Sequence, residues 1–318
     1  MSKIILGGAS IGSKSWYDWV VEDEQTVFKL LKHAYDKGIR TWDTSNSYSH
    51  GESERLIGKF LKQYNIPRST VVILTKVYSR SNDEPKLEDI PVNWVNRHGL
   101  SRKHIMDSVD ASVERLGTFI DVLQIHRCDP DTPAAETMEA LHDAIKSGKV
   151  HYIGASSMWV YQLAEYQNVA EKHGWTKFIS MQNHYSALYR EEEREVIPYC
   201  KKSGVALIPW GPVASGALAR PVSRLNETAR GKGNTWFGHS EADRTIISRV
   251  EEIAKNRGVT MAIVAIAWAI SKGTIPIVGF SEVERIDEAI ASLEFKLTEE
   301  EIKYIEEPYV PRAVVGHQ

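Results

Sequence analysis

Four polar residues in the first half of the chain have the types needed to protonate a carbonyl oxygen. Asp43 and Tyr48 lie in the stretch TWDTSNSYSHGESERLIG, Lys76 ends ILTK, and His126 ends DVLQIH. A tyrosine, with a reference pKa of about 10, can protonate a developing alkoxide at neutral pH if a nearby lysine favours the phenolate. Asp43 would hold Lys76 charged and in place, and His126 would orient the carbonyl oxygen.

Each of these residues has a simpler explanation when it is taken alone. An aspartate after a strand often caps a turn, a lysine is usually solvated, and a histidine can be a hydrogen-bonded core residue. Tyr48 could pack its ring on a helix and leave its hydroxyl in water. The chemical interpretation therefore depends on whether the fold brings the four side chains together.

Eight short apolar runs alternate with amphipathic stretches of helical length, which is typical of βαβ units around a parallel sheet. The runs are residues 3–6, 39–42, 71–74, 121–125, 150–154, 178–182, 205–209 and 274–278. Residues 24–38 and 101–117 are predicted helices that stop at Gly38 and Gly117, with Ser101 as N-cap of the second. Eight repeats favour an α/β fold of the (β/α)8 TIM-barrel type over an open doubly wound sheet. No Pro/Gly-rich linker divides the chain, so residues 1–318 are predicted to form one domain.

In such a barrel the polar residues at the strand ends meet at one mouth. Besides Asp43, Lys76 and His126, these are Ser156, Ser157, Gln182, Asn183 and Trp210. Two stretches are too long for ordinary connections, residues 77–100 after the third strand and residues 211–242 after the seventh. Both would lie on the C-terminal face, where barrel active sites are built, unless they are plain surface insertions.

Aromatic residues in the expected mouth loops favour a pocket for aryl or other planar molecules. They are Trp16, Tyr17, Trp94, Trp236 and Phe237. The alternative is that they pack the loops.

The composition is that of an ordinary globular protein, with 42% apolar and 25% charged residues. A net charge of -3 gives no basic field for nucleic acid, and Cys128 and Cys200 have neither disulfide-framework nor zinc spacing. We expect no signal peptide and no membrane span, because TMAIVAIAWAI at 260–270 has the length of a core helix. The expectation is a soluble, cytoplasmic protein.

At these residues the sequence resembles the aldo-keto reductase superfamily. The resemblance begins with WDTSNSYSHGESERLIG and continues through ILTK, DVLQIHR, YIGASS, QNHYSALYR, PWGPVASGALAR and IPIVGFSEVERIDEAI, over essentially the whole chain. LTEEEIKYIEEPYVPR, GASSM and LYREEER are similar to the fungal branch of aryl-alcohol dehydrogenases and versiconal hemiacetal acetate reductases. The resemblance implies a TIM barrel that binds NADPH in extended form and reduces aldehydes or ketones without metal. It also implies that Asp43, Tyr48, Lys76 and His126 form the catalytic tetrad.

The resemblance further implies which residues bind the cofactor. Ser156 and Gln182 match residues on the nicotinamide carboxamide, and Trp210 matches the ring that stacks on the nicotinamide. The pyrophosphate is assigned to the backbone of four residues, Gly211, Pro212, Gly216 and Leu218, together with Arg220. The 2'-phosphate is assigned to Ser281 and Arg285, and the adenine to Glu288. NADPH is therefore favoured over NADH.

This chain departs from the family pattern at several positions. Ser157 and Ala289 stand where asparagine is usual, and Glu282 places a negative charge near the expected phosphate. The first strand begins almost at once, without the usual N-terminal hairpin at the barrel bottom, so that the bottom layer would be exposed unless another segment covers it.

The leading functional hypothesis is NADPH-dependent reduction of a small-molecule aldehyde, aryl or planar, or of a ketone, with Tyr48 as general acid. The alternative is a regulatory subunit that binds NADP with slow or no turnover. A metal-dependent barrel enzyme is disfavoured, because the strand ends offer no cluster of His, Asp and Glu ligands.

Overall fold

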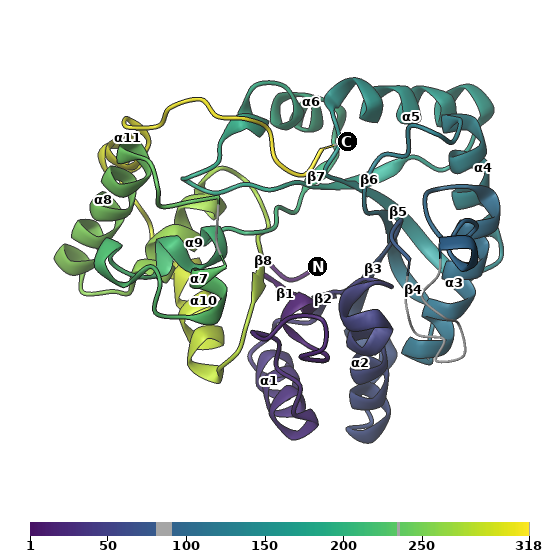
Figure 1. The fold of residues 1–318 in the computed structure, drawn as a ribbon, viewed down its shortest axis with the longest axis horizontal. Coiled ribbons are helices and arrows are strands. Elements are labelled where there is room, and N and C mark those ends of the chain that lie inside the picture. Colours follow the sequence, from purple (N-terminus) through teal and green to yellow (C-terminus); the bar gives the residue numbers. More distant parts are fainter. Residues whose placement is uncertain (81–90, 234–235, 318) are drawn as a thin grey trace.

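The computed structural model describes residues 1–80, 91–233 and 236–317, and its centre is one sheet of eight parallel strands. The strands curl into an arc with the helices outside it (Figure 1), and their order is β7-β6-β5-β4-β3-β2-β1-β8. Their bounds are β1 Ile5–Gly7, β2 Thr41–Asp43, β3 Val72–Val77, β4 Ile120–Ile125, β5 Val150–Ser156, β6 Phe178–Gln182, β7 Ala206–Leu207 and β8 Ile277–Gly279.

Backbone hydrogen bonds join the two ends of this order. The amide of Ile275 donates to the carbonyl oxygen of Leu207 at 2.9 Å, and the amide of Ile277 donates to that of Pro209 at 2.8 Å. The chain beyond β7 therefore lies beside β8, and the arrangement is the predicted TIM-barrel-like α/β fold.

Helices follow the strands in the expected alternation. They are α1 Glu24–Asp36, α2 Glu52–Gln63, α3 Arg102–Leu116, α4 Ala134–Lys146, α5 Val160–His173, α6 Val196–Ser203, α7 Ala229–Lys232, α8 Glu241–Arg257, α9 Met261–Ser271, α10 Val283–Glu294 and α11 Glu299–Glu306. The caps predicted for α3 are confirmed, because the Ser101 side chain accepts from the amide of His104 and Gly117 follows the helix at a φ of 67°. The apolar stretch 260–270 is indeed a buried helix, α9.

Strand boundaries differ from the predictions at the ends of the order. The predicted runs 3–6 and 274–278 begin before β1 and β8, because pairing in the sheet starts only where Ile5 lies opposite Ile277. Run 205–209 shortens to β7, Ala206–Leu207, for the same reason. Apolar residues outside the ladder, such as Ile4 and Ile208, are nevertheless buried.

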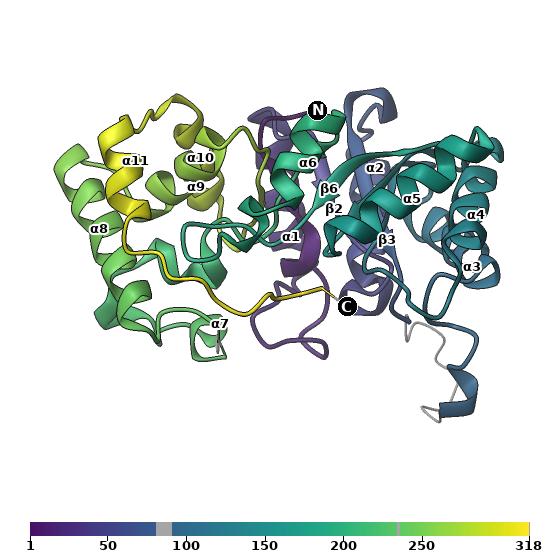
Figure 2. The same cartoon turned by 90° about the horizontal axis from the view of Figure 1, so that it is seen from above.

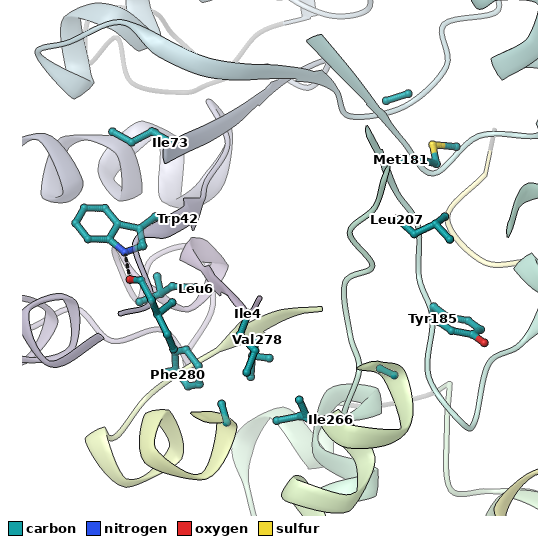
Figure 3. Packing of buried hydrophobic residues seen from close by; sticks show 14 of the residues in the cluster. Ile4, Leu6, Trp42, Ile73, Met181, Tyr185, Leu207, Ile266, Val278 and Phe280 are labelled. Atoms are coloured by element: carbon teal, nitrogen blue, oxygen red, sulfur yellow. Dashed lines mark hydrogen bonds between the residues drawn. The ribbon is translucent and has the colours of Figure 1, made fainter. Parts of the chain in front are cut away.

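The main core fills the space between the sheet and the helices. Leu6, Trp42 and Ile73 point outward into it (Figure 3), and the indole of Trp42 donates to the carbonyl oxygen of Ile39 at 2.9 Å. The alternate residues point into the barrel, because successive strand side chains face opposite sides.

A second apolar cluster fills the barrel interior. It consists of Ile5, Leu74, Val122, Ile208 and Ile277, each at most 6% exposed, with the partly buried Val72 and Ile275 packed against it. Of the described residues in this cluster, Val72 and Ile275 are partly exposed and the other five are buried.

Several segments gather at one side of the barrel. Figure 2 shows α7 and the loop after β1 on the side away from the N-terminus, with the C-terminal segment crossing from α11. Of the two predicted long loops, the part at 81–90 of the first and the part at 234–235 of the second lie outside the described residues. The described part of the second contains α7 and the short turns of helix Ala214–Ala219 and Val222–Arg224.

Among the described helices, none is by itself long and apolar enough to cross a membrane, and only the bent pair of α8 and α9 meets the length and composition criteria together.

Candidate active site

Lys76 is the centre of a buried polar group at the carboxyl ends of β2 and β3. Its ammonium donates to Asp43 Oδ2 at 2.6 Å, to the carbonyl oxygen of Thr44 at 2.8 Å and to the Tyr48 hydroxyl at 3.1 Å. Burial by itself would lower the pKa of Lys76, but Asp43 and Tyr48 outweigh it and the net shift is upward. At neutral pH, Lys76 therefore presents a positive charge to the phenol oxygen.

Both carboxylate oxygens of Asp43 accept hydrogen bonds. Oδ2 accepts from Lys76, and Oδ1 accepts from the side-chain Nε2 of Gln124 at 3.0 Å and from the side-chain Nε2 of Gln182 at 2.8 Å. The Gln182 amide also donates to Gln124 Oε1 at 2.8 Å. Because every one of these neighbours is a donor, both carboxylate oxygens have partners and the orientation of the Asp43 side chain is fixed.

Sequence reasoning did not single out Gln124 for this network. The signal was its place in the apolar run DVLQI, since a polar side chain that is fully buried in a strand needs a partner.

His126 follows β4 and lies beside Tyr48. The two ring centroids are 5.8 Å apart, the rings are nearly perpendicular, and Nδ1 lies 3.5 Å from the hydroxyl of Ser45. Desolvation, with smaller contributions from Lys76 and Arg127, holds the pKa of His126 well below its ordinary value. The imidazole is therefore neutral at pH 7, with one ring N–H that can donate to a carbonyl oxygen.

A left-handed turn positions Tyr48. The three residues that follow it, Ser49, His50 and Gly51, have φ angles of 49°, 56° and 86°. A Cβ at Gly51 would also lie 2.7 Å from Cδ of Arg115, so this position requires glycine for both conformation and space. Strain in non-glycine residues of about 1–3 kcal/mol each persists only where the surroundings hold them in place.

Glu54 on α2 supplies part of that support. Its side chain is 0% exposed, and it accepts a hydrogen bond from Arg115 Nε at 2.7 Å and another from the hydroxyl of Thr75. Thr75 directly precedes Lys76 in β3. The GESERLIG stretch therefore begins α2, as predicted, and also ties this helix to α3 and to the strand that carries Lys76.

The polar group opens into a cleft of about 470 Å³. Its lining includes Tyr48 and His126 and continues through Ser156 and Gln182 to the segments that follow β7 and β8. Most of the predicted strand-end residues thus line one cleft, whereas three lie outside its lining: Lys76, Ser157 and Asn183.

The segments after β7 and β8 contribute a cationic part of the cleft. Arg220, Ser281 and Arg285 line it. The pKa of Arg220 is lowered mainly by desolvation and secondly by the charge of Arg285. Ser215 and Gly216, in the turn before Arg220, have φ angles of 56° and 94°. Successive left-handed residues make concave backbone surfaces that accept anions, so this part fits a phosphorylated ligand.

Ser156 and Ser157 are held rigidly at the end of β5. Ser156 Oγ donates to the carbonyl oxygen of Gln182 at 2.7 Å, and the Ser157 amide donates to Asn183 Oδ1 at 2.9 Å. Asn183 in turn donates to the buried Glu192. This network keeps Ser157 at a φ of 45°, and its hydroxyl accepts from the indole of Trp210 at 3.3 Å.

Trp210 is one layer of an aromatic stack. Its ring lies 4.1 Å from that of His184 at an angle of 7°, and Tyr189 stacks on the other side of His184 at 4.7 Å. Phe237 meets His184 edge-on. The stack fixes the plane of the Trp210 ring, which borders the cleft.

Other predicted site residues are not placed at this cleft. Trp94 is 6% exposed and lies against Arg80 and Arg97, and Phe237 is buried in the core. Residue type and loop position could not tell these packing residues from pocket residues.

The remaining predictions divide between the cleft and its surroundings. Gly211, Pro212 and Gly216 line the cleft, whereas Glu288, Tyr17 and Trp236 are not in its lining. Trp16 is not in the lining either, but its ring centroid lies 5.5 Å from that of Tyr48.

Among the lining residues that the sequence analysis did not single out, three bear on the chemistry of the site. They are Trp19, Arg127 and Arg230. Arg127 directly follows His126, which was a usable signal, whereas nothing in the sequence around Arg230 indicates that its loop folds back over the mouth.

Within the three described ranges, no group of three or more His, Cys, Asp or Glu side chains is arranged to hold a metal ion. Cys128 and Cys200 are both buried free thiols.

The chain is similar to known proteins over nearly its whole length. The model described as the aldo/keto reductase family matches residues 3–309. Versiconal hemiacetal acetate reductase of Aspergillus parasiticus is 54% identical over 99% of this chain and 95% of its own length. A Schizosaccharomyces pombe protein named "Putative aryl-alcohol dehydrogenase" is 54% identical over 99% of this chain and 94% of its own length. An aldo-keto reductase of Fusarium vanettenii is 51% identical over all of this chain and 90% of its own length.

Proposed function

The chain belongs to the aldo/keto reductase family, and from this premise we propose that it reduces aldehydes to primary alcohols with NADPH, using Tyr48 as the general acid. It is an oxidoreductase of carbonyl compounds. The observation that carries the finer proposal is the Lys76 ammonium, which contacts both Asp43 and the Tyr48 hydroxyl at the end of the cleft.

Tyr48 gives its hydroxyl proton to the carbonyl oxygen as negative charge develops there. The Lys76 ammonium, 3.1 Å away, stabilises the phenolate that remains, and Asp43 keeps that ammonium oriented. General acid catalysis of this kind contributes about 10²- to 10⁴-fold to a rate.

His126 positions the carbonyl and does not supply the proton. Its depressed pKa keeps the imidazole neutral, so its ring N–H donates a hydrogen bond to the same oxygen that Tyr48 protonates. Two donors that converge on one oxygen favour the alkoxide over the carbonyl, because their hydrogen bonds strengthen as negative charge develops.

NADPH, when bound, supplies the hydride to the carbonyl carbon. Ser156 and Gln182 are the groups proposed for its carboxamide. Among the described residues, Gln182 donates two side-chain hydrogen bonds, both from Nε2, so that its Oε1 can accept one from the carboxamide. The planar ring of Trp210 offers a stacking surface for the nicotinamide.

Arg220, Ser281 and Arg285 provide the donors for the phosphates, and Glu288 is proposed for the adenine. Preference for NADPH over NADH follows from Ser281 and Arg285. Glu282, which lines the same part of the cleft, opposes it by charge repulsion.

Planar aldehydes, and ketones of similar shape, are the proposed substrates. The Trp16 ring beside Tyr48 offers an aromatic wall, and the name of the S. pombe relative refers to aryl alcohols.

Tyr48→Phe tests the assignment directly. The variant should lose at least about 10²-fold of kcat with NADPH and benzaldehyde, while the Kd for NADPH, measured by its fluorescence, stays within about twofold. Tyr152→Phe is the matched control, because Tyr152 is 54% exposed and lies in β5 well before the carboxyl end of that strand. Full turnover by Tyr48→Phe would refute the role of Tyr48. Tight NADPH binding by the unaltered protein, with no oxidation by any aldehyde tried, would instead favour the regulatory subunit.

A further inference from the structure

Two arginines border the cleft beside the proposed proton donor. Arg127 and Arg230 line the same cavity as Tyr48 and His126. Arg127 donates from Nη1 to the carbonyl oxygen of His126 at 2.5 Å, and the Arg230 guanidinium lies over the ring of Trp19 at 4.5 Å. These contacts fix both side chains without neutralising them.

Neither guanidinium has an acidic partner in the part of the chain that the structure describes. Among the described residues, the cleft lining holds two carboxylates, Asp43 and Glu282, and Asp43 is already paired with Lys76. Desolvation lowers the pKa of both arginines, and Tyr48 partly counteracts this shift for each of them. Arg230 is exposed and belongs to the cleft lining.

The phosphates of a dinucleotide do not explain both cations. Arg220 and Arg285 already serve the part of the cleft after β7 and β8. Arg127 follows β4, which is separated from β7 in the sheet order by β5 and β6. Arg230 belongs to the segment after β7, but its guanidinium lies over Trp19, whose ring neighbours that of Trp16, and the Trp16 ring neighbours Tyr48. Two positive charges at the reactive end are therefore left for the other ligand of the site.

We propose that the cleft selects aldehydes that carry a carboxylate, held by Arg127 and Arg230 while the carbonyl faces Tyr48 and His126. Guanidinium groups bind carboxylates through charge-assisted, often bidentate hydrogen bonds, and a ligand anion offsets the cost of desolvating them. The aromatic rings of Trp16 and Trp19 at the same end fit a planar spacer between the two groups. This inference rests on the proposed reductase function.

The test compares 4-formylbenzoate with 4-formylbenzamide, which has nearly the same shape and no charge. The unaltered protein should show a kcat/KM about tenfold or more higher for the carboxylate, since a hydrogen bond to a charged group accounts for about tenfold to a hundredfold. Raising the ionic strength should reduce this advantage and leave the amide unaffected. Equal kcat/KM values for the two substrates would overturn the carboxylate preference while leaving the reductase function intact. Absence of turnover with both would overturn both proposals.

Variants then assign the preference to the two arginines. Arg127→Met and Arg230→Met should each lower kcat/KM for 4-formylbenzoate about tenfold, with the amide value and the NADPH Kd within about twofold. Arg224→Met is the matched control, because Arg224 lies in the same long loop as Arg230 but pairs with Glu227 outside the cleft. A parallel loss for both substrates with weaker NADPH binding would assign these arginines to the cofactor and refute the inference.

Discussion

Asp43→Asn should destabilise the protein strongly although it preserves the shape of the side chain. The carboxylate accepts from the Lys76 ammonium on one oxygen and from the amides of Gln124 and Gln182 on the other. An asparagine must turn its NH₂ group toward one of these two sides. Either orientation places a donor against a donor, and the ammonium is left buried without its counterion.

The expected loss follows from the burial of the pair. Lys76 and Asp43 are 0% and 3% exposed, and removal of one partner from a buried pair costs about 3–5 kcal/mol. Unfolding entropy of about 2.1 cal/mol/K per residue over 318 residues then gives a decrease in Tm of about 6 °C.

A second substitution separates this mechanism from a general loss of packing. In Asp43→Asn combined with Lys76→Met the ammonium is gone, the asparagine oxygen can accept from both glutamines, and its NH₂ can donate to the carbonyl of Thr44 that Lys76 uses. The double variant should therefore be more stable than Asp43→Asn alone, with a coupling energy of about 2 kcal/mol or more.

Equilibrium urea unfolding of the four proteins, followed by circular dichroism, measures these differences. Effects that add to within about 0.5 kcal/mol would show that the pair is not coupled and would refute the reasoning. All three variants should lose reductase activity. Urea unfolding measures their stability without any assay of that activity.

Two further predictions concern buried groups that do not line the cleft. Glu54→Gln should cost about 3–5 kcal/mol in urea unfolding, because it leaves the guanidinium of Arg115 buried without its carboxylate, and a cost below about 1 kcal/mol would contradict this. Stability should also fall as the pH falls below about 6.5, because desolvation depresses the pKa of His104 to about 4 and that of His184 to about 3, so that only the unfolded chain gains protons there. Each histidine contributes about 2 kcal/mol of loss at pH 5, and in His104→Gln the unfolding free energy should depend less steeply on pH between 6.5 and 5.

The alternation of strands and helices could be read from the sequence because each run is short, apolar and followed by an amphipathic stretch. The boundaries of β1, β7 and β8 could not, since they depend on where the neighbouring strand begins. The strand-end positions of Asp43 and Lys76 followed from the pattern, and their contact with Tyr48 required the turn after β2.

The sequence did not indicate whether a loop side chain points into the cleft or into a packing contact. Trp94 and Phe237 have the residue type of a pocket wall, yet both are buried in packing contacts. Arg230 has the residue type of a solvated surface cation, yet it lies over Trp19 at the cleft. In each case a contact between segments far apart in the sequence decides the outcome.

The layer that holds Lys76 and Gln124 follows from strand register once the strands are assigned. Leu74 lies opposite Val122 in the pairing of β3 with β4, and both point into the barrel as part of its apolar interior. Two residues further along, Lys76 lies opposite Gln124, so the twofold periodicity of a strand places both of these side chains in the next layer toward the mouth. A polar layer directly above an apolar one experiences little screening by water, which strengthens the attraction between Lys76 and Asp43. The same apolar layer makes an unpaired charge there costly, so the residues that tune Tyr48 also determine the stability of the barrel interior.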